Sequence, residues 1–333
     1  MFILIVNLKI NSSTNLEKGS TNLSKMPKLL IICYTILILF CSAIGLSQDT
    51  NDTIYEGIHL DSNIVQAKKL GFDVNAFIRM VKNDKTFYQA FKNLRKASYD
   101  FNPDIKMYDK RDKTIASYRS QARQSYSAPC RTMLETDIET TGNFIEKNKS
   151  WHYYTSKMYQ RLFMTYGKIC ENEQEDKSGK MSKMDTYISE LKMLIFNPGQ
   201  PSSIPFIGNK TAIFDKKMMP YYDYKIEIKT YKEGQKCYVF TVEAKPQYKQ
   251  TDEVVIQFLQ TYFDVKNLQI VGRIYDLYYD NMFYDFDVHM DIQLQQIKSI
   301  YYPIKIRYDG IWDIPFKKPE KCLFTTSFKI LNQ

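Results

Sequence analysis

The segment Phe283–Ile297, which reads FYDFDVHMDIQLQQI, decides the fold. Polar and apolar side chains alternate along it, so a β-strand here has one polar face and one apolar face. The polar set is Asp285, Asp287, His289, Asp291, Gln293 and Gln295, and the apolar set is Phe286, Val288, Met290, Ile292 and Leu294. Such a strand is typical of an antiparallel sheet with one face covered. The function then depends on what covers the apolar face.

Alternating segments continue on both sides of this strand and predict about eleven to thirteen strands joined by short connections. Before it, we expect hairpins around Lys110–Lys113 and Lys232–Gln235, and a bulge near Gly272. After it, Tyr302–Tyr308 alternates up to a predicted Asp309-Gly310 turn. Further strands are predicted at Cys130–Ile138, Trp151–Thr155, Tyr159–Tyr166 and Phe324–Ile330.

Amphipathic helices interrupt the strands at two places. Asp73 is the predicted N-cap of a first helix, and Asp84 begins a second one directly after it. Their apolar side chains recur at helical spacing: Val74, Phe77, Ile78, Val81, Phe87, Phe91 and Leu94. A later helix is predicted after Asp185, with Ile188, Leu191, Leu194 and Ile195 on its apolar face. Helices of this kind can cover one side of a sheet.

The N-terminal part has the pattern of a secretory signal peptide. Lys28 precedes an apolar run from Leu29 to Phe40, and Gly45-Leu46-Ser47 supplies small residues for cleavage near Ser47. We expect Met26 to be the start and residues 48–72 to be a flexible leader. The alternative is an uncleaved membrane anchor, because the run is almost long enough to span a bilayer. The protein is expected in the periplasm or at the outer membrane.

Charge and cysteine content narrow the classes further. Removing residues 1–47 takes away four lysines and one glutamate, which changes the net charge from +9 to +6. The surplus is scattered among charges of both signs, so a nucleic-acid partner is not expected. Four cysteines remain, and the preferred pairing is Cys130–Cys170 and Cys237–Cys322. Buried free thiols are the alternative.

The best candidates for chemistry lie on the polar face of the opening segment. Asp285, Asp287, His289 and Asp291 share that face, which could suit a hard cation or a histidine oriented by a carboxylate. Asp276 and Asp280 lie nearby in sequence. The same residues are also what the solvent side of an amphipathic strand requires. No GxSxG, HExxH, P-loop, GxGxxG or EF-hand motif is present, so we assign no catalytic, metal or cofactor residue.

The order of these features resembles a known family. An N-terminal amphipathic helix pair, a long antiparallel meander and one-sided final strands such as IRYDGIWDIPF and CLFTTSFKI are similar to exported Gram-negative proteins of half-barrel architecture. The layout resembles the periplasmic carriers and receptors of outer-membrane lipoproteins (the LolA/LolB-like half-barrel). The resemblance implies an unclosed β-barrel whose helices cover an apolar cavity for acyl chains. It carries no functional residue over to this chain.

We therefore expect a mainly β (α+β) fold over residues 73–333, a single strongly curved antiparallel sheet with amphipathic helices on its concave face. The expected function is non-catalytic binding of a lipid or an acylated partner by a monomer, without cofactor. Phe286, Val288, Met290, Ile292 and Leu294 are the predicted groove lining, because a large apolar face must be covered. The alternatives are an interaction module of the envelope without a small ligand, and a metal-dependent envelope hydrolase.

Overall fold

A computed structural model describes residues 73–171, 198–202, 207–281, 285–313 and 317–331. All of these residues belong to one compact unit of the chain, residues 55–333. The strands of this unit are β1 Tyr99–Tyr108, β2 Thr114–Ser127, β3 Cys130–Thr141, β4 Ile169–Cys170, β5 Tyr222–Thr230, β6 Lys236–Ala244, β7 Ile256–Asp264, β8 Ile270–Asp280, β9 Asp285–Ile297, β10 Ile300–Asp313 and β11 Glu320–Ile330. Its helices within the described residues are α3 Val74–Asn83, α4 Thr86–Leu94 and α5 Tyr154–Phe163, with 3-10 turns η1 Gly208–Thr211, η2 Met219–Tyr221, η3 Lys232–Gly234 and η4 Pro246–Tyr248.

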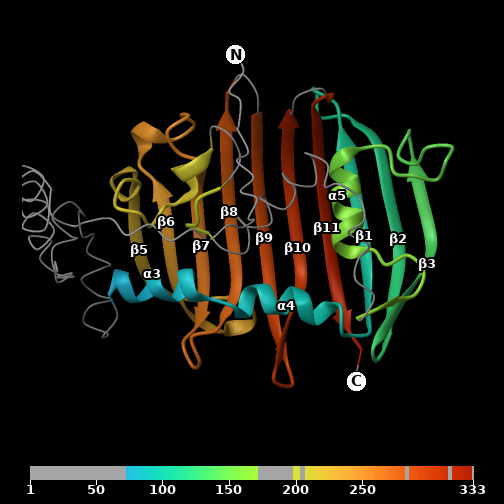
Figure 1. Ribbon diagram of the computed structural model, residues 1–333, viewed down its shortest axis with the longest axis horizontal. Coiled ribbons are helices and arrows are strands. Elements are labelled where there is room, and N and C mark those ends of the chain that lie inside the picture. Colours follow the sequence, from blue (N-terminus) through green and yellow to red (C-terminus); the bar gives the residue numbers. More distant parts are fainter. Residues whose placement is uncertain (1–72, 172–197, 203–206, 282–284, 314–316, 332–333) are drawn as a thin grey trace, which may run out of the picture. The chain divides into compact units, whose positions relative to one another are not determined.

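The strands form one open antiparallel sheet of 11 strands, which confirms the predicted fold class. Their order is β4-β3-β2-β1-β11-β10-β9-β8-β7-β6-β5 (Figure 1). Strands β5 to β11 follow one another as neighbours, and β11 then pairs with β1 along its whole length. Strand β9, the opening segment of the sequence, pairs with β8 and β10 and is therefore interior to the sheet.

Helices α3 and α4 lie across one face of the sheet (Figure 1). Asp73 caps α3, accepting a hydrogen bond from the Ala76 N–H at 2.6 Å. The α3 residue Phe77 is fully buried, with its ring 5.8 Å from Phe240 of β6 and 5.6 Å from Phe263 of β7. The predicted apolar faces of both helices thus pack on the inner faces of the strands and form the core with them.

Residues 151–166 differ from the prediction of two strands. Trp151 makes only an isolated β-bridge with Ile145, and Tyr154–Phe163 is helix α5. Thr155, Tyr159 and Phe163 recur every four residues and are the buried side of that helix. The dense aromatic content favoured strands, but the spacing of the side chains that become buried is helical.

The Asp309-Gly310 pair was predicted to be a turn, and this prediction is wrong. Strand β10 continues through it, and Gly310 pairs with Val288 of β9 and Cys322 of β11. A Cβ at Gly310 would lie 2.4 Å from the hydroxyl oxygen of Tyr308. The glycine therefore makes room for the Tyr308 side chain, which is a known reason for glycine inside a strand.

The cysteines divide into one disulfide and two free thiols. Cys130 and Cys170 are bonded and join the start of β3 to β4. Cys237 on β6 and Cys322 on β11 are both free and buried. The expected pairing of these two is wrong, because the four strands β7 to β10 lie between them in the sheet. Neighbouring strands are roughly 4.8 Å apart, far more in total than a disulfide can bridge.

Several predictions concern residues outside the described ones. These are the signal peptide at Met26–Gln48, the leader at 48–72 and the helix after Asp185. Within the described ranges, no helix combines the length and the apolar character needed to cross a membrane.

Candidate functional site

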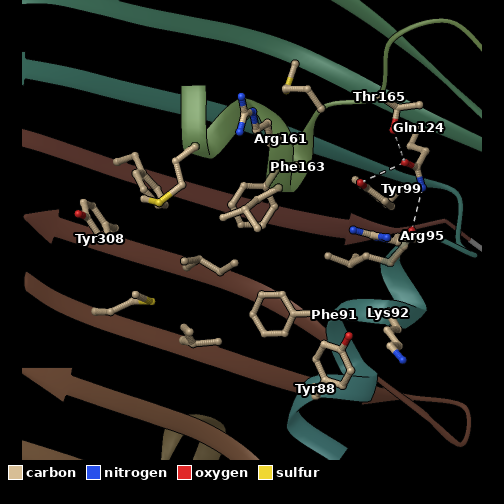
Figure 2. A pocket seen from close by; sticks show the side chains of 18 of the residues that line it. Tyr88, Phe91, Lys92, Arg95, Tyr99, Gln124, Arg161, Phe163, Thr165 and Tyr308 are labelled. Carbon is tan, nitrogen blue, oxygen red and sulfur yellow. Dashed lines mark hydrogen bonds between the residues drawn. The ribbon is translucent and has the colours of Figure 1, made fainter. Parts of the chain in front are cut away.

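A pocket of about 290 Å³ lies between helices α4 and α5 and the covered face of the sheet (Figure 2). Strands β8, β9, β10 and β11 supply its floor, α4 and α5 supply its walls, and β1, β2, β3 and the segment after α5 supply one end. Its volume is close to the lower end of the ~300–1,000 Å³ that is usual for small-molecule sites. The pocket therefore suits one slender ligand.

The floor of the pocket is apolar because each floor strand sends alternate side chains to this face. Val288, Met290 and Ile292 of β9 all line it, and so do Leu277, Ile306, Tyr308, Trp312 and Phe324 of the neighbouring strands. Three of the five predicted groove residues are therefore part of the pocket floor. Phe286 and Leu294 are buried in the core and are absent from the lining, so only the middle of the predicted stretch faces the cavity.

The helical walls come from the apolar faces of two helices. Phe91 and Leu94 of α4 and Met158, Leu162 and Phe163 of α5 line the pocket. In Figure 2 the Phe91 ring points into the cavity, across from Phe163. None of these residues was among the predicted groove lining. Phe91 and Leu94 had been placed on a helix face expected to pack in the core, and α5 had been taken for strands.

One end of the pocket is polar and organised around Gln124 of β2. Its amide nitrogen donates to the carbonyl oxygens of Leu94 (2.8 Å) and Ala97 (2.9 Å). Its amide oxygen accepts hydrogen bonds from the Thr165 hydroxyl (3.2 Å) and the Tyr99 hydroxyl (3.4 Å). Gln124 is buried, so these four bonds fix its position and tie the end of α4 to the sheet.

Positive charge surrounds the pocket. Its described lining contains Lys92, Arg95, Arg131 and Arg161, and it contains no aspartate or glutamate. Arg131 Nε donates to the Thr165 hydroxyl at 3.3 Å, so this guanidinium reaches the polar end. Burial raises the pKa of Tyr99 strongly, and the charges of Arg131 and Arg95 oppose that shift.

The described lining offers little for catalysis. It holds no histidine, cysteine, serine, aspartate or glutamate. Burial raises the pKa of Tyr99 and of Tyr308 well above the ordinary value, so both phenols stay protonated at neutral pH. The pocket can hold and orient an amphiphilic molecule, and the protonated Tyr99 and Tyr308 supply no phenolate to act as nucleophile or general base.

The polar face of β9 lies on the opposite side of the strand from the pocket floor. His289 Nδ1 is 2.5 Å from Asp276 Oδ1 of β8, and both side chains are about half exposed. Burial, followed by the charges of Asp276 and Asp309, raises the pKa of Asp287. Among the described residues, no group of three or more His, Cys, Asp or Glu side chains could hold a metal ion.

Comparisons with known proteins give structural likenesses only. No family model matches the sequence, and no curated protein matches it. Among solved structures, a LolA superfamily protein from Nitrosomonas europaea is 11% identical over 77% of this chain and 94% of that one, with a TM-score of 0.21. An outer membrane lipoprotein-sorting protein domain from Vibrio parahaemolyticus is 6% identical over 74% and 91%, with a TM-score of 0.25.

A third structure is a DUF1329 family protein from Desulfovibrio piger, which is 8% identical over 72% of this chain and 87% of that one, with a TM-score of 0.22. TM-scores this low carry no argument about function.

Proposed function

We propose that this protein is a non-catalytic binding protein of the cell envelope, which takes a lipid or the acyl chain of an acylated partner into the pocket between α4, α5 and the sheet. The observation that carries this proposal is a cavity of about 290 Å³ whose floor is apolar and whose helices contribute Phe91, Leu94, Met158, Leu162 and Phe163 to its lining. Catalysis is not needed for this role, and the lining residues favour binding over chemistry.

The physical basis is the burial of methylene groups. Moving one CH₂ from water into an apolar site is favourable by about 0.8 kcal/mol, so a chain of a dozen carbons has ample driving force. Phe91, Phe163 and Trp312 offer flat apolar surfaces to such a chain, and Met158 and Met290 are flexible enough to follow its shape. The envelope location remains a proposal from the signal-peptide pattern at Met26–Gln48.

A neutral probe tests this function without involving the charges around the pocket. We expect N-phenyl-1-naphthylamine to become more fluorescent when mixed with the purified chain, and dodecanol to displace it with one-to-one stoichiometry. Absence of probe uptake and of any dodecanol effect, measured on folded protein, would contradict the proposal. In that case the remaining alternative is an interaction module without a small ligand.

A further inference from the structure

We infer that the exposed side of helices α3, α4 and α5, here called the helix face, docks on the surface of an anionic lipid bilayer with the mouth of the pocket toward the lipid. The inference adds a partner surface to the proposed function and does not depend on which ligand the pocket holds. It is carried by the sign of the charges on the helix face and by the place where the pocket opens.

The helices that cover the sheet are strongly basic. Residues 73–98 and 151–168, which hold α3, α4, α5 and their flanks, contain nine lysines and arginines and only two aspartates. Six of these basic residues form no salt bridge with any described residue; five of the six are exposed, and Lys157 is partly buried. The six are Arg79, Lys82, Lys85, Lys92, Lys157 and Lys168.

The acids in and next to these stretches are already engaged. Asp73 accepts a backbone N–H at the start of α3. Asp84 caps α4 and lies 4.0 Å from the buried guanidinium of Arg273. Glu171, just after the second stretch, pairs with Lys96 at 2.7 Å, so Lys96 is not one of the six. The helix face therefore keeps a clear excess of positive charge.

The basic side chains point away from the sheet. Figure 1 shows α3, α4 and α5 on the same side of the sheet. Helices α3 and α4 bury Phe77 and Phe87 in the core, so the exposed Arg79 and Lys92 lie on the outer side of their helices. The other side of the sheet carries the aspartates of the β9 polar face. This asymmetry of charge would turn the helix face toward a negative surface.

The pocket opens on the helix face. Tyr88 and Lys92 of α4 both line the pocket, and both side chains are exposed. The Lys92 ammonium lies 4.5 Å from the centre of the Tyr88 ring, and Figure 2 shows the two side chains together at the border of the cavity. Tyrosine and lysine suit the boundary between water and lipid, since each combines an apolar body with a polar tip. A ligand entering here would pass from the bilayer into the pocket without crossing bulk water.

A lipid surface fits this charge pattern better than an acidic protein does. The six basic residues are spread over three helices and their flanks instead of gathering at one spot. A bilayer with anionic lipids presents a continuous plane of negative charge, so each basic residue near it contributes about fivefold in binding. An acidic protein would have to match the positions of these side chains one by one.

Co-sedimentation of the full chain with lipid vesicles tests this inference. We expect vesicles of phosphatidylcholine with about one-third phosphatidylglycerol to bind the chain about tenfold or more tightly than phosphatidylcholine alone, and high salt to remove the preference. The apolar run Leu29–Phe40 is present in both measurements, so its contribution cancels in the comparison. Equal binding to the two kinds of vesicle would overturn the inference.

A triple variant assigns the preference to the helix face. Arg79→Gln, Lys82→Gln and Lys85→Gln together should weaken binding to the anionic vesicles by about thirtyfold or more. All three side chains are exposed, so the fold should tolerate the changes, as circular dichroism can verify. Because the N-terminal lysines are unchanged in this variant, the loss reports the helix face alone.

The matched control removes the same three charges from another exposed place. Lys110→Gln, Arg111→Gln and Lys113→Gln lie in the turn after β1, at the end of that strand far from α4. This control should weaken binding to the anionic vesicles by no more than about threefold, because salt screens distant charges. Equal weakening by the two triple variants would show that only net charge matters, which overturns the inference.

Tryptophan substitutions determine which side meets the lipid. With brominated lipid in the anionic vesicles, the fluorescence of Tyr88→Trp should be quenched, because this residue borders the mouth of the pocket. Ile311→Trp, exposed on the other side of the sheet, should keep its fluorescence. Trp151 and Trp312 are buried and give the same background in both variants. Quenching of Ile311→Trp to the same or a greater extent would overturn the inference.

The same proteins separate this inference from the proposed function. The triple variant on the helix face changes no lining residue, so its dodecanol binding should stay within about twofold of the parent. If dodecanol does not bind the parent but the preference for anionic vesicles persists, the proposed function fails and this inference stands. If the chain shows no such preference and instead binds poly-glutamate through Arg79, Lys82 and Lys85, the partner is an acidic protein and the inference is overturned.

Discussion

At the scale of single residues, the buried Arg273 of β8 links the helices to the sheet. Its side chain is fully buried, and the guanidinium lies 4.4 Å from the ring centre of Phe87 of α4. Nε donates to the Thr261 hydroxyl and Nη1 to the Tyr275 hydroxyl, both at 3.2 Å. Nη2 makes no hydrogen bond to any described residue, and Asp84 Oδ2 lies 4.0 Å from it.

Asp84 therefore has two roles that one experiment can separate. Its carboxylate accepts the N–H groups of Thr86 (3.0 Å) and Phe87 (3.1 Å) at the start of α4, and it neutralises Arg273. We expect Asp84→Ala to lower the free energy of unfolding by about 3–5 kcal/mol, because a buried charge loses its partner. In an Arg273→Met background the same change should cost only about 1 kcal/mol, the value of a helix cap.

Chemical denaturation of the four proteins in this cycle measures the coupling between Asp84 and Arg273. If Asp84→Ala costs the same free energy of unfolding in both backgrounds, the Asp84 carboxylate does not stabilise the charged Arg273 guanidinium.

The raised pKa of Asp287 gives a prediction about pH at the same scale. An acid whose pKa is higher in the folded state than in the unfolded state holds its proton more tightly when folded, so stability falls as pH rises through that window. Asp287→Asn removes this loss and should raise the melting temperature at pH 7, whereas at pH 3 the two proteins should melt alike. Asp223→Asn on the exposed edge of β5 is the control. A lower melting temperature at pH 7 would contradict this account.

At the scale of elements, helix α5 is held at its first turn by a residue far away in sequence. Glu320 of β11 accepts the N–H groups of Tyr154 and Thr155, both at 2.9 Å, and the Thr155 hydroxyl at 2.7 Å. These are the unpaired donors of a helix N-terminus, and Tyr153 at the N-cap position supplies no side-chain bond of its own. The strand thus provides the cap that the local sequence lacks.

Removing that cap should loosen one wall of the pocket. We expect Glu320→Ala to cost about 2 kcal/mol of stability, and Glu320→Gln to cost less because the amide oxygen still accepts hydrogen bonds. Hydrogen exchange should rise first in Tyr154–Phe163 for the alanine variant. Unchanged protection of α5 would show that its packing on β11 suffices.

The elements also show where the sequence was predictive. The alternation of Phe286 to Leu294 identified β9 and its covered face, because a period of two has only one structural meaning. Helix α5 was missed because its buried side includes Thr155 and Ser156, which carry little hydrophobic signal. A search at spacing four would have joined Thr155, Tyr159 and Phe163.

The pocket was predictable only in part, for a physical reason. Val288, Met290 and Ile292 follow from one strand, whereas the polar end joins Arg95, Gln124 and Arg131 from three elements. Nothing local distinguishes these cations from ordinary solvated ones, since their meaning depends on the pairing of β2 with β1 and β3.

At the scale of the whole described unit, the pairing of β1 with β11 brings the parts of the pocket together. Strand β1 follows α4, and β11 lies more than two hundred residues later, yet they pair from Tyr99–Ile330 to Tyr108–Lys321. This pairing places α4 and α5 on the same face as the apolar floor from β9 and β10. An apolar face of this size must be covered, and the helices cover it while leaving a cavity between them.

The most direct test of ligand binding in this cavity is a substitution that fills it with a larger side chain from the floor. Ile306 of β10 lines the pocket, whereas Ile311 of the same strand is exposed on the other face. With both variants folded and melting like the parent, Ile306→Phe should weaken dodecanol binding by about tenfold, and Ile311→Phe should leave it unchanged. Undiminished dodecanol binding by Ile306→Phe would place the ligand elsewhere and contradict the account.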